Sequence, residues 1–168
     1  MAEKFVQLVG GIPTEKEGLT TSTGAASAGR VVALNSQGDI DQSMLPPGVA
    51  PDIATLVCAE AVTAGDFVNV FNDAGTPKVR RADATTAGKH AHGFVLEDAD
   101  LDATAAVYFE AVNNMVTGHV AGDVFLDTTP GAATATPPNG SGNIVQRLGV
   151  ASSATSINVE FGQYYVLA

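Results

Sequence analysis

Three histidines are the side chains of this sequence best suited to metal or acid–base chemistry. His90 and His92 flank Ala91, so in an extended chain both imidazoles project from one face, and His119 is available as a third ligand. The pair follows a polar loop, and Ala91 replaces the acidic or cysteine ligand usually found nearby. We therefore expect solvated or hydrogen-bonded loop histidines. Whether His90, His92 and His119 bind a metal is left open.

An acidic segment offers a second set of ligands. Asp98, Asp100 and Asp102 have the first three ligand spacings of a calcium-binding EF-hand loop. That loop would need Gly and Glu at the positions held here by Ala103 and Phe109, so the motif fails. We expect a solvated acidic loop, and a looser calcium site formed by the three aspartates is left open.

No catalytic or phosphate-binding motif is found. The glycines of Thr23–Arg30 lack the Gly-Lys-Ser/Thr ending that cradles phosphates, and no Gly-x-Ser-x-Gly elbow or serine–histidine pattern occurs. Arg80 and Arg81 form the only basic pair. They alternate across a predicted strand, so we expect ion pairs with carboxylates, within the chain or across a subunit contact, and no contact with nucleic acid. These observations predict a protein that is not an enzyme and needs no cofactor.

The charge of the chain argues against nucleic acid and membranes as partners. It carries 18 acidic and 8 basic side chains, a formal net charge of −10, and phosphate backbones and anionic lipids repel such a surface. The apolar run within Met1–Gly11 is too short for a signal peptide, and no stretch has the length of a membrane span. Cys58 lies in an apolar run and is expected to be buried. We predict a soluble protein made in a cytoplasm.

The second half of the chain contains a degenerate internal repeat. Ala64–Leu96 and Ala121–Val150 each open with Ala-Gly-Asp and an apolar run, pass through a Gly-containing turn and a polar loop, and close on an apolar run around Gly93 or Gly149. The openings lie about 57 residues apart and the closing glycines about 56, so the register holds. Because no reactive side chain recurs at matching positions, the repeat indicates a β-rich scaffold and not a catalytic fold.

Residues 55–168 are dense in strand signals. The hydrophobic share is 45%, yet aromatics are 6% and Trp is absent, which favours a thin core of small β-branched side chains. We predict strands at Thr55–Val62, Phe67–Asn72, Lys78–Ala82, His92–Leu96, Ala105–Glu110, Val124–Asp127, Ala132–Thr136, Ile144–Val150, Ser156–Phe161 and Tyr164–Leu167. The predicted fold is all-β, an antiparallel β-sandwich or small β-barrel.

Residues 1–54 have a different character. Thr14–Arg30 is rich in Gly, Ser and Thr and shows no apolar period, so alone it should be flexible. Two apolar islands, Phe5–Val9 and Arg30–Leu34, interrupt the region. We predict an extended N-terminal arm with short anchoring strands, long enough at about 3.3 Å per residue to lie across neighbouring subunits and to fold on contact with them.

Ala28–Pro47, which reads AGRVVALNSQGDIDQSMLPP, resembles a segment that precedes the β-rich domain of tailed-bacteriophage virion proteins. The later stretches AGDFVNV, HGFV, GDVFLD and QRLGVA are similar to those of the head decoration (cement) or head-fibre proteins in the same group. The resemblance covers roughly Ala28–Phe161, and its motifs are structural.

The resemblance implies a non-enzymatic virion protein that binds the outer face of the assembled capsid and stabilises the head. The implied partners are the major capsid protein and further copies of this chain, as a homotrimer or a dimer. We expect the capsid or oligomer interface to include Arg30, Val32, Leu34, Ile40, Met44, Leu45, Pro46, Arg80 and Arg81.

Two other functions are open at this point. A phage fibre, tail or baseplate module could bind a host receptor or glycan, but sugar sites usually use exposed aromatic rings, and we expect most of the tyrosines and phenylalanines to lie in strand cores. An enzyme or ligand-binding barrel would need a pocket in which side chains such as His90, His92 and Asp98 converge. The number of copies, the position on the capsid and the strand edges that meet a partner are not fixed by the sequence.

Overall fold

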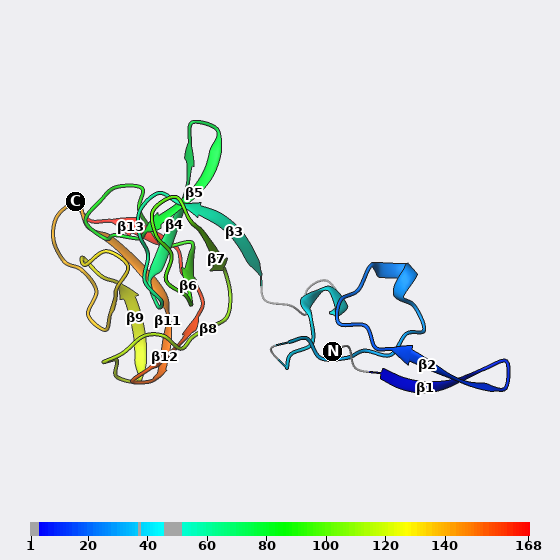
Figure 1. The fold of residues 1–168 in the computed structure, drawn as a ribbon. Helices are drawn as coiled ribbons and strands as arrows, with labels where there is room; N and C mark the ends of the chain where they lie inside the picture. The colour runs from blue at the N-terminus through cyan, green and yellow to red at the C-terminus, as the bar shows by residue number, and fades with distance from the viewer. Residues whose placement is uncertain (1–3, 37, 46–51) are drawn as a thin grey trace. The chain divides into compact units, whose positions relative to one another are not determined.

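The computed structural model describes residues 4–36, 38–45 and 52–168, and within these ranges it contains strands and short 3₁₀ segments but no α-helix. The chain divides into two units, Met1–Ala50 and Pro51–Ala168 (Figure 1). The all-β prediction is confirmed. Among the described residues, none belongs to a helix long and apolar enough to span a bilayer.

The N-terminal unit begins with a two-stranded antiparallel hairpin. β1 (Lys4–Val9) pairs with β2 (Ile12–Glu17) along its whole length. Gly10 and Gly11 join them with φ values of 59° and 83°, and a type I′ turn needs positive φ at both of these positions, which favours Gly-Gly. β2 also corrects the prediction of a flexible segment from Thr14, because cross-strand pairing holds these polar residues in a strand.

The rest of the N-terminal unit has little regular structure. Leu19 and Val32 form one parallel bridge, held by hydrogen bonds from the Leu19 N–H to the Val31 carbonyl and from the Ala33 N–H to the Leu19 carbonyl. The described part of this unit also contains two short 3₁₀ segments, η1 (Gly24–Ser27) and η2 (Gln42–Met44). No described residue whose exposure is defined in this unit is buried, so these parts of the unit have no hydrophobic core.

The C-terminal unit starts with a closed barrel of five strands. They are β3 (Ile53–Cys58), β4 (Phe67–Asp73), β5 (Thr76–Arg81), β6 (Gly93–Val95) and β7 (Thr104–Tyr108), arranged in the order β3-β5-β4-β6-β7. The barrel closes where β3 runs parallel to β5, with Val57 opposite Lys78 and Cys58 opposite Val79. The other pairs are antiparallel, so the antiparallel prediction is wrong only at this closing pair.

A second sheet follows the barrel. Its strands are β8 (Val112–Asn113), β9 (Gly122–Leu126), β10 (Ala133–Thr134), β11 (Ile144–Ser153) and β12 (Ser156–Val159), in the order β10-β9-β11-β12-β8, and β13 (Tyr164–Val166) also pairs with β11. All these pairs are antiparallel. The ten predicted strands are therefore confirmed, with ends displaced by at most four residues, whereas β8 was not predicted.

The barrel and the second sheet share the same strand topology. In each, the first strand after Ala-Gly-Asp is central and the next two strands of the chain lie on either side of it, as β5-β4-β6 and β10-β9-β11. The match extends further, because β3 pairs with β7 and β8 pairs with β12. The sequence repeat therefore belongs to a unit of five strands, closed in the first copy and open in the second.

Two apolar cores occupy the C-terminal unit. Inside the barrel lie small side chains, namely Cys58, Val62, Val68, Val79, Val95, Ala105 and Val107. Between the barrel and the second sheet lies a core that includes Phe67, Phe94, Leu126, Ile144, Leu148 and Ile157. Successive side chains of a strand point to opposite faces, so one strand contributes to both cores. Phe67 of β4 lies in the core between the sheets, and the next residue, Val68, lies in the core of the barrel. Burial of Cys58 is confirmed.

Buried amide side chains join the two sheets. The Gln146 side chain bonds both backbone groups of Ala91, accepting from its N–H at 2.7 Å and donating to its carbonyl at 2.9 Å. Asn113 donates to the Gly65 carbonyl at 2.8 Å. Because each amide is buried and bonded, these contacts fix the position of the barrel against the second sheet.

Candidate functional site

The N-terminal unit is the shorter of the two, yet it carries half of the large apolar side chains that are exposed among the described residues. These eight are between 47% and 70% exposed: Val6, Leu8, Val9, Ile12, Val31, Val32, Leu34 and Ile40. So many exposed apolar side chains on a small unit indicate a contact surface. We call this set the N-terminal apolar surface.

A hollow of about 360 Å³ lies within the N-terminal unit. One side is formed by Lys4 and Phe5 of β1, and the other by Gly18 and the extended segment Val31–Leu34. Gly18 allows the close approach of that segment, since a Cβ on this residue would lie 2.7 Å from the Cβ of Ala33. The hollow is mostly apolar and can accept a side chain of a partner.

Most of the interface residues predicted in the arm are part of this surface or lie next to it. Val32, Leu34 and Ile40 are exposed, whereas Met44 and Leu45 are half-buried. The guanidinium of Arg30 is used within the unit, where it donates to the Glu17 carbonyl at 3.1 Å. Pro46 lies outside the described residues.

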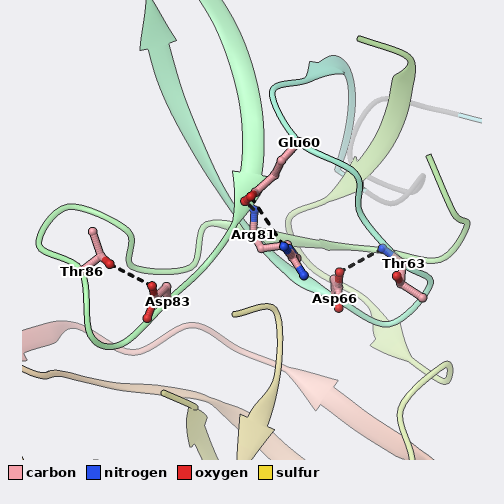
Figure 2. Close-up of polar contacts among 6 residues, drawn as sticks. All are labelled: Glu60, Thr63, Asp66, Arg81, Asp83 and Thr86. Carbon is pink, nitrogen blue, oxygen red and sulfur yellow. Dashed lines mark hydrogen bonds and ion pairs between the residues drawn. The ribbon is translucent and has the colours of Figure 1, made fainter. Parts of the chain in front are cut away.

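Arg80 and Arg81, the interface residues predicted in the C-terminal domain, point to opposite faces of β5. Arg80 donates to the Asn69 side-chain oxygen at 3.0 Å and lies 4.2 Å over the Phe71 ring. Arg81 forms an ion pair of 3.7 Å with Glu60 (Figure 2). A carboxylate partner within the chain is therefore confirmed for Arg81, whereas Arg80 contacts an amide and an aromatic ring.

Two carboxylates near Arg81 support turns (Figure 2). Burial raises the pKa of Asp66, although its carboxylate accepts the Thr63 backbone N–H at 2.9 Å. Burial also acts to raise the pKa of Asp83, but hydrogen bonds from Thr85 and Thr86 outweigh it and hold that pKa below its usual range. Both carboxylates shape loops, and neither faces a second carboxylate in hydrogen-bonding distance.

His90 and His92 come together as the sequence suggested, but as packed rings. Their centroids lie 4.4 Å apart, and His90 stacks on Tyr164 at 4.0 Å. Nδ1 of His92 accepts the Val70 backbone N–H at 3.0 Å. Burial lowers the pKa of both rings, and the neighbouring His90 lowers that of His92 further. His92 is therefore one of the hydrogen-bonded loop histidines that we expected, and both rings are half-buried against neighbouring rings.

The other candidate ligands do not gather around a metal. Asp98 accepts the Ala64 backbone N–H at 2.8 Å, and its surrounding hollow is lined by residues 96–99, 104–106 and 108, without either histidine. His119 lies in a different hollow, beside Asp66 and Gly131. In the described ranges, no three side chains of the metal-ligating types are close enough to hold an ion.

The β1–β2 hairpin is the feature of the candidate site that sequence reasoning missed. It carries Val9 and the three most exposed residues of the N-terminal apolar surface, namely Val6, Leu8 and Ile12. The available signal was Gly10-Gly11 between two short runs, a typical sequence for a two-residue hairpin turn. Its polar second strand concealed it, because Thr14–Glu17 has no apolar alternation.

Comparison with known proteins gave no match to any family model, any curated protein or any solved structure.

Proposed function

We propose that this protein is a non-enzymatic structural component of a tailed-bacteriophage virion, a decoration protein that binds the outer face of the capsid and stabilises the head. The N-terminal apolar surface makes the contact with the major capsid protein. The C-terminal domain remains on the outside, where its acidic surface is compatible with solvent and is kept from nucleic acid by charge repulsion.

The observation that carries the proposal is the contrast between the two units. Each unit exposes eight large apolar side chains among its described residues, but the N-terminal unit buries none of those for which exposure is defined, whereas the C-terminal unit holds two cores. Apolar burial is the main favourable term in folding, so the N-terminal unit gains most of its stability from a surface outside itself. A lattice of identical subunits supplies such a surface many times over.

The resemblance of Ala28–Pro47 to phage virion proteins agrees with this assignment. Val31, Val32 and Leu34 of that segment are exposed and line the hollow of the N-terminal unit. Each of these side chains contributes about 1–2 kcal/mol when its exposed part is buried against a partner. Several such contacts, repeated over symmetry-related copies, give stable attachment through avidity.

Attachment to empty mature heads tests the proposal. We expect the double substitution Val32→Asp and Leu34→Asp to reduce the affinity for heads at least about tenfold, because two carboxylates would have to be desolvated in the contact. Val120→Asp is the matched control, since Val120 is 75% exposed but lies on the C-terminal domain. Sedimentation of heads with labelled protein measures the bound fraction.

The truncated protein consisting of residues 51–168 should remain folded and fail to attach. Attachment of the wild-type protein should also raise the temperature at which empty heads break open. Wild-type attachment by the truncated protein, or by the double variant, would reject the proposal.

A specific observation also favours a second candidate, a fibre, tail or baseplate module that binds a host receptor or glycan. Two aromatic residues, Tyr164 and Tyr165, are 44% and 59% exposed on β13. Exposed rings are the platforms on which sugars stack. Binding to a glycan array that is lost in Tyr165→Ala, with no attachment to heads, would establish this function instead.

A further inference from the structure

The two strands of the N-terminal hairpin differ in what their outer edges offer to another strand. In a hairpin with a two-residue turn, the pair beside the turn exchanges both backbone hydrogen bonds, and bonded and unbonded pairs then alternate. The pair beside this turn is Val9 and Ile12. On β1, the backbone N–H and carbonyl groups of Lys4, Val6 and Leu8 therefore point away from β2.

The outer edge of β2 is protected against further pairing. Its outward positions are Pro13, Glu15 and Glu17, opposite Leu8, Val6 and Lys4 of β1. Pro13 has no N–H to donate at this edge. The charged side chains of Glu15 and Glu17 also disfavour the addition of another strand. These are the features by which natural edge strands avoid association.

The outer edge of β1 has no such protection. It contains no proline, and Lys4 at its end is its only charged residue. Val6 and Leu8 are 70% and 69% exposed. Within the part of the chain that the structure describes, the backbone of β1 bonds to no strand except β2. A two-stranded hairpin is only marginally stable in water, and additional strands stabilise it.

We propose that β1 pairs in the antiparallel direction with β1 of a second copy of this chain, about a two-fold axis at Val6, to give a four-stranded sheet in the order β2-β1-β1-β2. In this register the two Val6 residues lie opposite each other, and Lys4 of each copy lies opposite Leu8 of the other. The outward backbone groups of one β1 then meet the outward groups of the other.

Charge favours a second copy as the occupant of this edge. The two-fold register places the two Lys4 residues at opposite ends of the contact, each beside an apolar residue. Glu15 and Glu17 remain on the outer strands, away from their copies, so no like charges meet. The self-pairing contact is isologous and closes, as in most soluble dimers. The inference does not depend on the proposed function.

The mass of the full-length protein in solution tests the pairing. Leu8→Pro removes one outward N–H from β1 and leaves the β1–β2 hydrogen bonds intact, because Leu8 is at an unbonded position of the hairpin. We expect an even-numbered wild-type assembly and a variant of half its mass by sedimentation velocity. Glu15→Pro is the matched control, since it removes an outward N–H from the edge that Pro13 already blocks; its mass should equal that of the wild type.

Disulfide trapping tests the register. Opposed residues in such a pair have Cα atoms about 5.5 Å apart, within the range of a disulfide, and Cys58 is buried and will not compete. We expect oxidised Val6→Cys to run at twice the chain mass on a non-reducing gel and Glu15→Cys to stay single. A monomeric wild type, a mass unaffected by Leu8→Pro, or no Val6→Cys cross-link overturns the inference.

Two further outcomes separate this inference from the proposed function. Loss of head attachment in Leu8→Pro with no change of mass would show that a capsid strand occupies the edge, and would also overturn it. A cross-linking dimer that never binds heads would uphold the inference while rejecting the proposed function.

Discussion

The imidazole of His92 accepts the Val70 N–H through Nδ1, so in the folded protein its own proton is on Nε2. Protonating Nδ1 would break this bond and place a cation beside His90, whose ring lies 4.4 Å away. The stack of His90 on Tyr164 links the same pair to β13. His90 and His92 therefore pack as uncharged rings in the folded protein. Their protonation should make the stability of the protein depend on pH.

We expect stability to fall as the pH falls through about 6.5, the value at which histidines of the unfolded chain take up protons. Burial lowers the pKa of His90 and His92 in the folded state, so over this window the unfolded chain binds protons that the folded protein does not. The loss stops below the folded pKa values. Thermal unfolding at pH 7.5 and 5.5 measures it.

The control for the histidine prediction is the double variant His90→Phe with His92→Asn. Phe keeps a ring against Tyr164, and the Asn oxygen keeps an acceptor for the Val70 N–H. Most of the difference between the two pH values should vanish in this variant. If the stability difference between pH 7.5 and pH 5.5 is not reduced in this variant, other titratable groups cause it and the prediction is wrong.

At the scale of elements, the repeat explains which glycines cannot be replaced. Gly93 of β6 and Gly149 of β11 close the two copies, and each lies against the next strand of its own sheet. A Cβ on Gly93 would be 2.8 Å from the Tyr108 carbonyl oxygen of β7, and one on Gly149 would overlap the backbone carbonyl oxygen of Asn158 in β12. Because the obstacle is backbone in both copies, neither site can relax by moving one side chain.

Gly149→Ala should therefore destabilise the protein by about 3 kcal/mol or more, since it combines a backbone clash with a φ of 152°. Gly122→Ala separates the two effects, because Gly122 has a φ of 139° but open space around its Cβ position. Its cost should be smaller, about 1–2 kcal/mol. Urea unfolding followed by circular dichroism measures both, and equal costs would contradict the steric argument.

Much of this architecture could be predicted from local patterns. Apolar alternation located ten strands, and the repeat located the copies, because both depend on residues near one another in sequence. The parallel β3–β5 pair could not be predicted, since it pairs Cys58 with Val79 although β4 lies between them in the sequence. β8 was missed because two residues, Val112 and Asn113, carry no periodicity.

The candidate site was predicted only in part, for a related reason. Val32, Leu34 and Ile40 stood out as apolar residues in a polar region, and they are exposed. The partners of Arg80 and His92 were not predictable, because Asn69 and Val70 reach them only through the pairing of β4 with its neighbours. Exposure itself depends on which side chains the tertiary fold leaves uncovered.

At the scale of the whole molecule, the account depends on a difference in stability between two parts of one chain. The C-terminal unit has a closed barrel, a shared core and buried amide links, whereas the N-terminal unit has a hairpin and one bridge between Leu19 and Val32. Local stability follows the number of buried apolar contacts. The N-terminal unit should therefore open easily in the free protein.

Hydrogen–deuterium exchange of the full-length protein, free and attached to heads, is the most direct measurement of this difference. In the free protein, the Leu19 and Ala33 amides should exchange at least about 100-fold faster than those of Val79 and Val95 in the barrel. On attachment, Leu19 and Ala33 should become protected while the barrel amides stay unchanged. Barrel-like protection of Leu19 and Ala33 in the free protein, or no gain on attachment, would contradict the account.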